Sequence, residues 1–193
     1  MPPLKSRKLQ TFPPALRRFG ELTPAEVLAL AIHTERANTR RFRAFAGIFR
    51  GYDEEVARRF EELAQEEQGH EERLLEEFQR RFGDTIPPVD ETDVDVVIES
   101  PDLDDAEHQI FDSLKPARVY ELALQAEHLA REFYLRAAAA SHDPQLIHLY
   151  KEFAQMEGDH VAWVEQKIAP ASGAGAKAGA IPVSEQNHEP PQS

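Results

Sequence analysis

The sequence predicts an all-α fold, a four-helix bundle made of two copies of one helical hairpin joined by a long crossover. Long segments place apolar residues at three- and four-residue intervals, which is the period of an α-helix. Two Glu-x-x-His steps, Glu67 with His70 and Glu157 with His160, lie in matching phrases ninety positions apart. A proline-containing stretch without helical rhythm separates the halves, and long crossovers are a known bundle topology.

The first hairpin is expected to contain two helices. The first begins at Thr23–Glu26, where threonine can cap, proline suits the first turn and glutamate completes a capping box, and it runs to about Gly51. Its apolar face carries one acid, Glu35. Asp53 can cap the second helix and Gly83 is placed to end it. The inward stripe of this second helix contains Val56, Phe60, Leu63, Glu67, His70, Leu74 and Phe78.

The second hairpin repeats this pattern. Its first helix is expected from about Pro116 to Ala140, with Glu127 on the apolar side. Its second helix follows a cap and a first-turn proline at Asp143-Pro144 and ends before Pro170. The inward stripe of this last helix contains Leu146, Tyr150, Phe153, Glu157, His160, Val164 and Ile168.

The domain boundaries follow from these patterns. The bundle is expected over residues 21–168, after a flexible basic N-terminal segment at 1–20. The crossover at 84–114 holds eleven acids and no Lys or Arg, and we interpret it as a solvated loop rather than a device that concentrates cations. An Ala/Gly-rich and polar tail at 169–193 is expected to be disordered.

Composition excludes several classes of protein. A chain of 193 residues suits one domain, and its net charge of −13 argues against nucleic acid as a partner. With no cysteine, the chain has no disulfide and no cysteine-held metal. No secretory signal or membrane span is visible in the sequence, so we expect a cytoplasmic protein.

Six residues form the candidate site. Each predicted helix places one glutamate on its apolar face, and two helices add a histidine three residues later, within reach of the same ion. This is the ligand set of di-iron and di-manganese carboxylate bundles. We therefore expect two bound metal ions, and because oxygen and imidazole ligands suit iron, manganese and zinc, the ligand type alone does not fix the metal. The expected ligands are Glu35, Glu67, His70, Glu127, Glu157 and His160.

The same residues carry a resemblance to a known family. The phrases Leu28–Ile32, Glu66–His70 and Arg81–Asp84 resemble the rubrerythrin and erythrin branch of the ferritin-like superfamily, over about residues 21–168. The chain looks especially like the di-iron domain that some bacteria fuse to a vacuolar-type membrane iron transporter. The resemblance implies a ferritin-like bundle, two irons held by the same six residues, and ferroxidase or peroxide-reducing activity.

Three departures from that family shape the expected function. The chain lacks the Cys-rich rubredoxin domain, so peroxidase turnover would need an external electron donor. Ala130 stands where rubrerythrins tend to carry an extra carboxylate, and nothing after Ile168 could span a bilayer as the transporter does. These departures favour a ferroxidase that oxidises Fe²⁺ with O₂ or H₂O₂, in iron homeostasis and peroxide protection.

The sequence leaves several alternatives open. The chain could instead buffer iron or deliver it to a partner, act as a rubrerythrin-type peroxidase, or oxygenate an organic substrate in an apolar pocket. A homodimer is expected, because hairpin duplications permit packing between copies. Tyr134 and Tyr150 share the ligand stripes and are candidates for hydrogen bonding to the ligands, although core packing is the commoner role. Surface positions are expected for His33, His128, His142 and His148.

Overall fold

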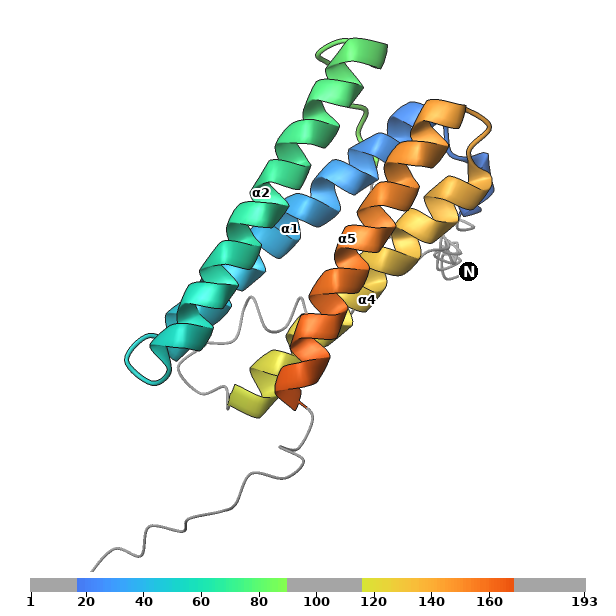
Figure 1. Ribbon diagram of the computed structural model, residues 1–193. Coiled ribbons are helices and arrows are strands. Elements are labelled where there is room, and N and C mark those ends of the chain that lie inside the picture. The colour runs from blue at the N-terminus through green and yellow to red at the C-terminus, as the bar shows by residue number, and fades with distance from the viewer. Residues whose placement is uncertain (1–16, 90–115, 169–193) are drawn as a thin grey trace, which may run out of the picture.

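The computed structural model describes residues 17–89 and 116–168 (Figure 1). These residues form four long helices, α1 (Pro24–Phe49), α2 (Glu54–Phe82), α4 (Pro116–Ala140) and α5 (Pro144–Ile168), preceded by a short 3-10 turn, η1 (Phe19–Glu21). The predicted all-α bundle is confirmed. Most of the predicted basic segment (1–20), most of the crossover (84–114) and the tail (169–193) lie outside the described residues.

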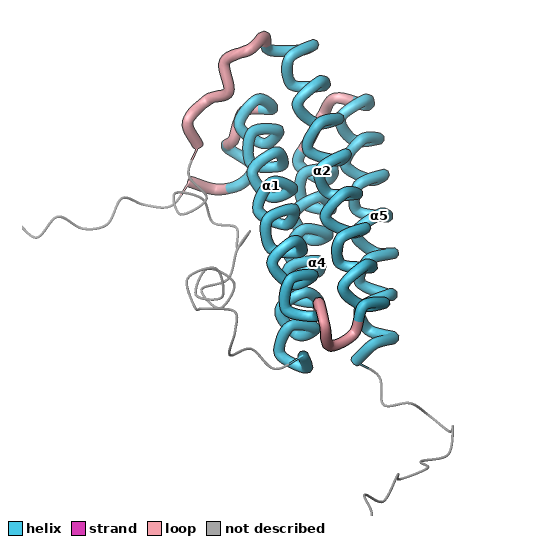
Figure 2. Tube along the Cα trace, turned by 90° about the vertical axis from the view of Figure 1, so that its left-hand side faces the viewer, coloured by secondary structure: helices cyan, strands magenta, loops and turns pink. Residues whose placement is uncertain are grey.

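The bundle consists of two antiparallel hairpins. A turn at 50–53 joins α1 to α2, and a turn at 141–143 joins α4 to α5. The helices within each hairpin pack along their length, and α1 also packs against α4. Figure 2 shows the four helices side by side along one common direction. This arrangement brings the two Glu-x-x-His helices, α2 and α5, into one bundle.

The helices begin where the sequence supplies caps. The Thr23 hydroxyl accepts the N–H of Glu26 at 3.3 Å, and Glu26 accepts the N–H of Thr23 at 2.8 Å, which completes the predicted capping box. Asp53 accepts the N–H three residues on at 3.1 Å, and Asp143 does the same at 3.3 Å. Helix α2 ends at Gly83, whose φ of 81° suits glycine.

Two apolar clusters fill the bundle, one toward each end. The first lies near the α4–α5 turn and the start of α1, and the second lies near the α1–α2 turn. The first apolar cluster includes Phe19, Leu28, Ile32, Leu74, Phe78, Phe133, Tyr134, Leu146, Tyr150 and Phe153. The second apolar cluster includes Phe42, Phe45, Phe49, Phe60, Leu63, Ala126, Val119, Leu122 and Val164.

The four inward glutamates lie between these clusters. Along α1, Glu35 falls between Ile32 of the first cluster and Phe42 of the second. Helix α5 follows the same order, and α2 and α4 run the opposite way, from the second cluster to the first, so each glutamate marks the point where its helix passes from one cluster to the other. All four carboxylates are fully buried. The bundle therefore contains one acidic layer with apolar side chains on both sides.

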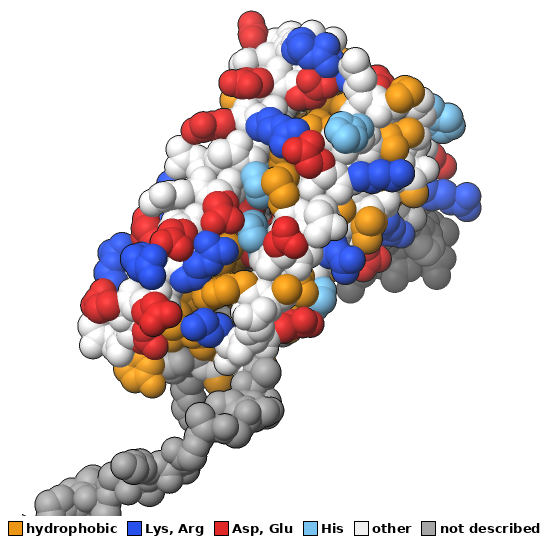
Figure 3. Space-filling view, viewed as in Figure 1, with side chains coloured by type: hydrophobic (Ala, Val, Ile, Leu, Met, Phe, Trp, Pro, Cys, Tyr) orange, Lys and Arg blue, Asp and Glu red, His pale blue; other side chains and the backbone are white. Residues whose placement is uncertain are grey.

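Ion pairs join the two hairpins along the α2–α5 surface. Both terminal nitrogens of Arg73 donate hydrogen bonds to the carboxylate of Glu152, at 2.8 and 2.7 Å. The guanidinium of Arg81 pairs with the carboxylate of Asp143 at 2.5 Å. Acidic and basic side chains are interspersed over this face (Figure 3). Such exposed pairs contribute little stability each, so the apolar clusters hold the hairpins together. In the described part of the chain, no helix is both long and apolar enough to cross a bilayer.

Candidate metal centre

The structure brings the six predicted ligands together in the acidic layer. The first group of side chains comes from α1, α2 and α5, and its ligand atoms all lie within 4.8 Å of one another. In this group, Nδ1 of His70 lies 3.2 Å from Oε2 of Glu67, 3.4 Å from Oε2 of Glu35 and 3.7 Å from Oε1 of Glu157. The histidine therefore directs its Nδ1 atom toward three carboxylates.

A second group lies beside the first and shares two of its members. It contains Glu67, Glu127, Glu157 and His160, again with ligand atoms within 4.8 Å of one another. Nδ1 of His160 lies 3.0 Å from Oε1 of Glu67 and 3.5 Å from Oε2 of both Glu127 and Glu157. The rings of His70 and His160 lie nearly parallel, with centroids 6.0 Å apart. Glu67 and Glu157 thus belong to both groups, while each group has its own glutamate and histidine.

The buried atoms of this layer lack ordinary partners. In residues 17–89 and 116–168, eleven buried side-chain N or O atoms have no hydrogen-bond partner, and seven of them belong to the six residues. Both oxygens of Glu127 and of Glu157 are among the seven, as is Nδ1 of His160. A buried polar group without a partner is costly, and a buried carboxylate more so. Metal ions in the layer would supply the missing partners, so the residues present fit a metal-binding site.

Burial changes the pKa values of the carboxyl groups. Desolvation, together with the negative charge of Glu67, raises the pKa of Glu35 to about 8. Desolvation also raises the pKa of Glu127 well above its ordinary value, against the opposing effect of His160. For Glu67, burial and the charge of Glu157 are outweighed by hydrogen bonds, and the pKa is lowered. Without metal, burial therefore favours the protonated, uncharged form of both the Glu35 and the Glu127 carboxyl groups.

The histidines hold protons as well. Burial alone would lower the pKa of His70, but hydrogen bonds and charges from Glu35 and Glu67 outweigh it and raise the pKa to about 10. In the same way burial would lower the pKa of His160, but the charge of Glu127 and hydrogen bonds to Glu127, Glu157 and Glu66 together outweigh it and raise the pKa well above its usual range. Metal ligands must be deprotonated, so metal binding at neutral pH would release protons from this layer.

Comparison with known proteins assigns the chain to a family. A family model named Rubrerythrin matches residues 26–166, which include nearly all of the four helices and all six candidate ligands. The chain belongs to the rubrerythrin family. Family membership and the carboxylate and histidine cluster together indicate a di-iron protein.

A solved structure shows the same fold. The crystal structure of an uncharacterized conserved protein from Magnetospirillum magnetotacticum MS-1 matches this rubrerythrin-family chain with a TM-score of 0.62 and 24% sequence identity. The match covers 80% of this chain and 100% of that one. At this identity the likeness shows the fold alone. No curated protein matches the sequence.

Sequence analysis missed one contact of this rubrerythrin-family site. Oε2 of Glu66, the residue before Glu67, lies 2.9 Å from Nε2 of His160, and the hydrogen bond to His160 is the main reason that the pKa of Glu66 falls to about 2. Glu66 is one helical turn before His70 and so shares a face of α2 with it. That spacing was the available signal, but the contact crosses to α5 and depends on how the hairpins pack.

The two candidate tyrosines have different positions relative to the acidic layer. The hydroxyl of Tyr134 donates a hydrogen bond to Oε1 of Glu35, whereas the buried hydroxyl of Tyr150 has no partner in the described residues. Helical side chains lean toward the N-terminus of their helix. Tyr134 follows Glu127 on α4 and therefore leans toward the layer, while Tyr150 precedes the glutamate of α5 and leans away from it.

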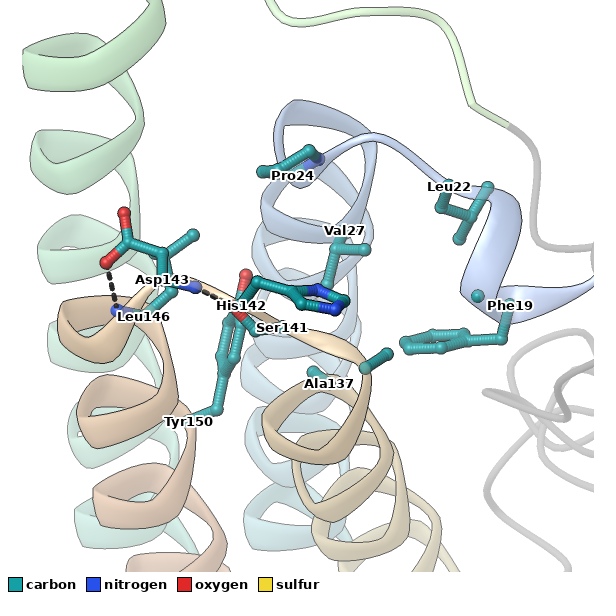
Figure 4. A pocket seen from close by; sticks show the side chains of 12 residues that line it. Phe19, Leu22, Pro24, Val27, Ala137, Ser141, His142, Asp143, Leu146 and Tyr150 are labelled. Carbon is teal, nitrogen blue, oxygen red and sulfur yellow. Dashed lines mark hydrogen bonds between the residues drawn. The ribbon is translucent and has the colours of Figure 1, made fainter.

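Tyr150 instead lines a cavity at the end of the bundle. This cavity of about 400 Å³ lies between η1, the start of α1 and the α4–α5 turn, and none of the six candidate ligands lines it. Figure 4 shows the Tyr150 side chain extending toward Ser141 and His142 at its wall. The surface positions predicted for the four other helical or turn histidines are confirmed, since His33, His128, His142 and His148 are all exposed.

Proposed function

We propose that this rubrerythrin-family protein is a di-iron ferroxidase, which oxidises Fe²⁺ with O₂ or H₂O₂ in iron homeostasis and peroxide protection. One observation carries the proposal: two overlapping groups of ligand atoms share Glu67 and Glu157. A single mononuclear site would need only one group. Two groups with common carboxylates suit two ions held close together.

Each of the six residues has a role in this proposal. Glu35 and His70 would complete the ligands of one iron, and Glu127 and His160 those of the other. Glu67 and Glu157 would help to hold both ions, because they belong to both groups. Two irons bound in this way supply redox chemistry that passes electrons to O₂ or H₂O₂ in pairs. Oxygen and nitrogen ligands of this kind suit iron, manganese and zinc, so the metal is a proposal from the family.

The chain itself controls water and protons around the site. The apolar clusters lie on both sides of the acidic layer and limit access of water from the bundle ends. Tyr134 holds Glu35 by a hydrogen bond. Reduction of H₂O₂ to two waters takes up two electrons and two protons, and oxidation of two Fe²⁺ substrate ions provides the electrons. The expected stoichiometry is therefore two Fe²⁺ for each H₂O₂.

Stopped-flow oxidation of Fe²⁺ tests the proposal. Protein freed of metal under anaerobic conditions is mixed with Fe²⁺ and then with O₂ or H₂O₂, and the near-ultraviolet absorbance is followed. Glu67→Ala should abolish the fast phase, because it removes a ligand from both groups. Glu76→Ala, an exposed glutamate on the same helix, is the matched control and should leave the phase unchanged. An absent oxidant-dependent phase in the native protein, or an unchanged one in Glu67→Ala, would reject the proposal.

Ala130 supports a ferroxidase over a peroxidase. The rubrerythrins that the sequence resembles tend to carry a further carboxylate at this position, whereas Ala130 is fully buried and supplies no ligand.

Repeated turnover with excess Fe²⁺ separates a ferroxidase from an iron buffer, which would bind a fixed amount of iron and stop. Elemental analysis of anaerobically purified protein identifies the native metal. A cytoplasmic location and a homodimer remain predictions, which cell fractionation and light scattering would test.

A further inference from the structure

The two halves of the acidic layer differ in what lies behind their histidines. His160 directs Nδ1 into the layer, and its outer nitrogen, Nε2, lies 2.9 Å from Oε2 of Glu66. Arg59 holds Glu66 in place at 2.8 Å, and the Arg59 guanidinium lies 5.5 Å from the ring centre of Trp163 on α5. A chain of contacts from α5 to α2 and back therefore fixes the orientation of the His160 ring.

Within the described part of the chain, His70 lacks a corresponding carboxylate partner. It also directs Nδ1 into the layer, but in residues 17–89 and 116–168 no carboxylate contacts its Nε2 atom. Its ring instead meets the edge of Phe153, with centroids 5.1 Å apart. The two Glu-x-x-His helices differ at the residue before the inward glutamate, which explains why only one histidine has a carboxylate behind it in the described residues. Glu66 precedes Glu67 on α2, whereas Met156 holds the corresponding position on α5.

We propose that Glu66 is a positioning residue that makes the two metal positions unequal, so that the ion held by Glu127 and His160 binds more tightly than the ion held by Glu35 and His70. The proposal rests on the ligand roles given under the proposed function. A carboxylate that accepts the N–H of a histidine keeps the proton on that nitrogen and leaves the other nitrogen free to bind metal. It also increases the basicity of the ligand. Among the residues that the structure describes, only His160 has this partner.

The first test is a titration of metal-depleted protein with Mn²⁺, followed by calorimetry and electron paramagnetic resonance. The native protein should bind in two steps, and one equivalent should give the signal of isolated Mn²⁺ rather than of a magnetically coupled pair. Glu66→Leu removes the hydrogen-bond acceptor and should weaken the tight step about 10- to 100-fold while leaving the other step unchanged. Glu66→Gln keeps an uncharged acceptor and should have a smaller effect.

The second test introduces the missing partner. Met156→Glu places a carboxylate at the corresponding position of the second hairpin and should strengthen the weaker step, so that the two affinities approach each other. His160→Ala should remove the tight step and His70→Ala the weak one, which assigns each step to its half of the layer.

The outcomes separate this proposal from the proposed function. Equal affinities in the native protein, or equal losses at both steps in Glu66→Leu, would overturn the role of Glu66 and leave a two-metal site intact. Binding of no Mn²⁺ at all, confirmed with Fe²⁺ under anaerobic conditions, would overturn both. The Glu66 side chain is 43% exposed, so its substitution should leave the metal-depleted protein folded, with an unfolding midpoint lowered only modestly by loss of the contacts to His160 and Arg59. Equal weakening of both binding steps together with a lowered midpoint would indicate a merely structural role.

Discussion

Raising the pH from 6.5 to 8 should destabilise the metal-depleted protein. The pKa of Glu35 is raised to about 8 and that of His70 to about 10, from ordinary values of 4.5 and 6.5. The stability that each proton provides is fully present below the pKa of the unfolded chain and is lost as the pH rises through the folded pKa. In this window the folded state therefore binds more protons than the unfolded state, and the free energy of unfolding falls as pH rises.

The size of the effect follows from the proton count. One proton held only by the folded state changes the free energy of unfolding by about 1.4 kcal/mol for each pH unit. Glu35 is already half deprotonated at pH 8, and unfolded His70 is still half protonated at pH 6.5, so each contributes somewhat less than the full value. Together they should lower the free energy of unfolding by about 2–4 kcal/mol across the window.

Urea unfolding followed by circular dichroism measures this change, with a chelator present at both pH values. Glu35→Gln carries no titrating group at that position and should show a weaker pH dependence than the native protein. Protein loaded with Zn²⁺ should show a weaker or reversed trend, because metal binding requires deprotonated ligands and strengthens as pH rises. A free energy of unfolding that is constant or increases from pH 6.5 to 8 in the metal-depleted protein would refute the reasoning.

Three further predictions concern single side chains. Phe60→Ala removes a fully buried ring from the second apolar cluster and should lower the free energy of unfolding by about 3–5 kcal/mol in urea titrations. A loss under about 1 kcal/mol would contradict the packing. Thr23→Ala removes the cap shared with Glu26 and should cost about 1 kcal/mol in the same assay, whereas no loss would place the start of α1 elsewhere. Tyr134→Phe keeps the ring but loses the hydrogen bond to Glu35, so the free energy of unfolding should fall by about 1 kcal/mol. Elemental analysis of this variant should still find two metal equivalents. Loss of an equivalent would show that the hydroxyl is essential for metal binding.

Local patterns were sufficient to predict most of the fold. Caps such as Thr23 and Asp53 act on backbone groups within three residues, so the sequence shows them directly. Glu35 and Glu127 were recognisable because an acid on an otherwise apolar helix face needs a partner that the face itself does not supply. That reasoning predicted that the six side chains converge, which the structure shows.

Contacts between the hairpins were harder to predict. The partner of Glu66 is His160 on another helix, and which residue it meets depends on the rotation and height of α2 relative to α5. The different positions of Tyr134 and Tyr150 could have been inferred from the direction in which helical side chains lean, because one follows its inward glutamate and the other precedes it. Periodicity alone treats the two tyrosines as equivalent.

The division of the interior into two apolar clusters affects how this protein can tolerate substitutions during evolution. Because the acidic layer separates them, a substitution near the α1–α2 turn has no shared neighbour with one near the α4–α5 turn, and distant sites without common partners act additively. Each end of the molecule can therefore be remodelled on its own. The cavity beside Tyr150 can be enlarged, narrowed or given new chemistry while the opposite end keeps the helices in register.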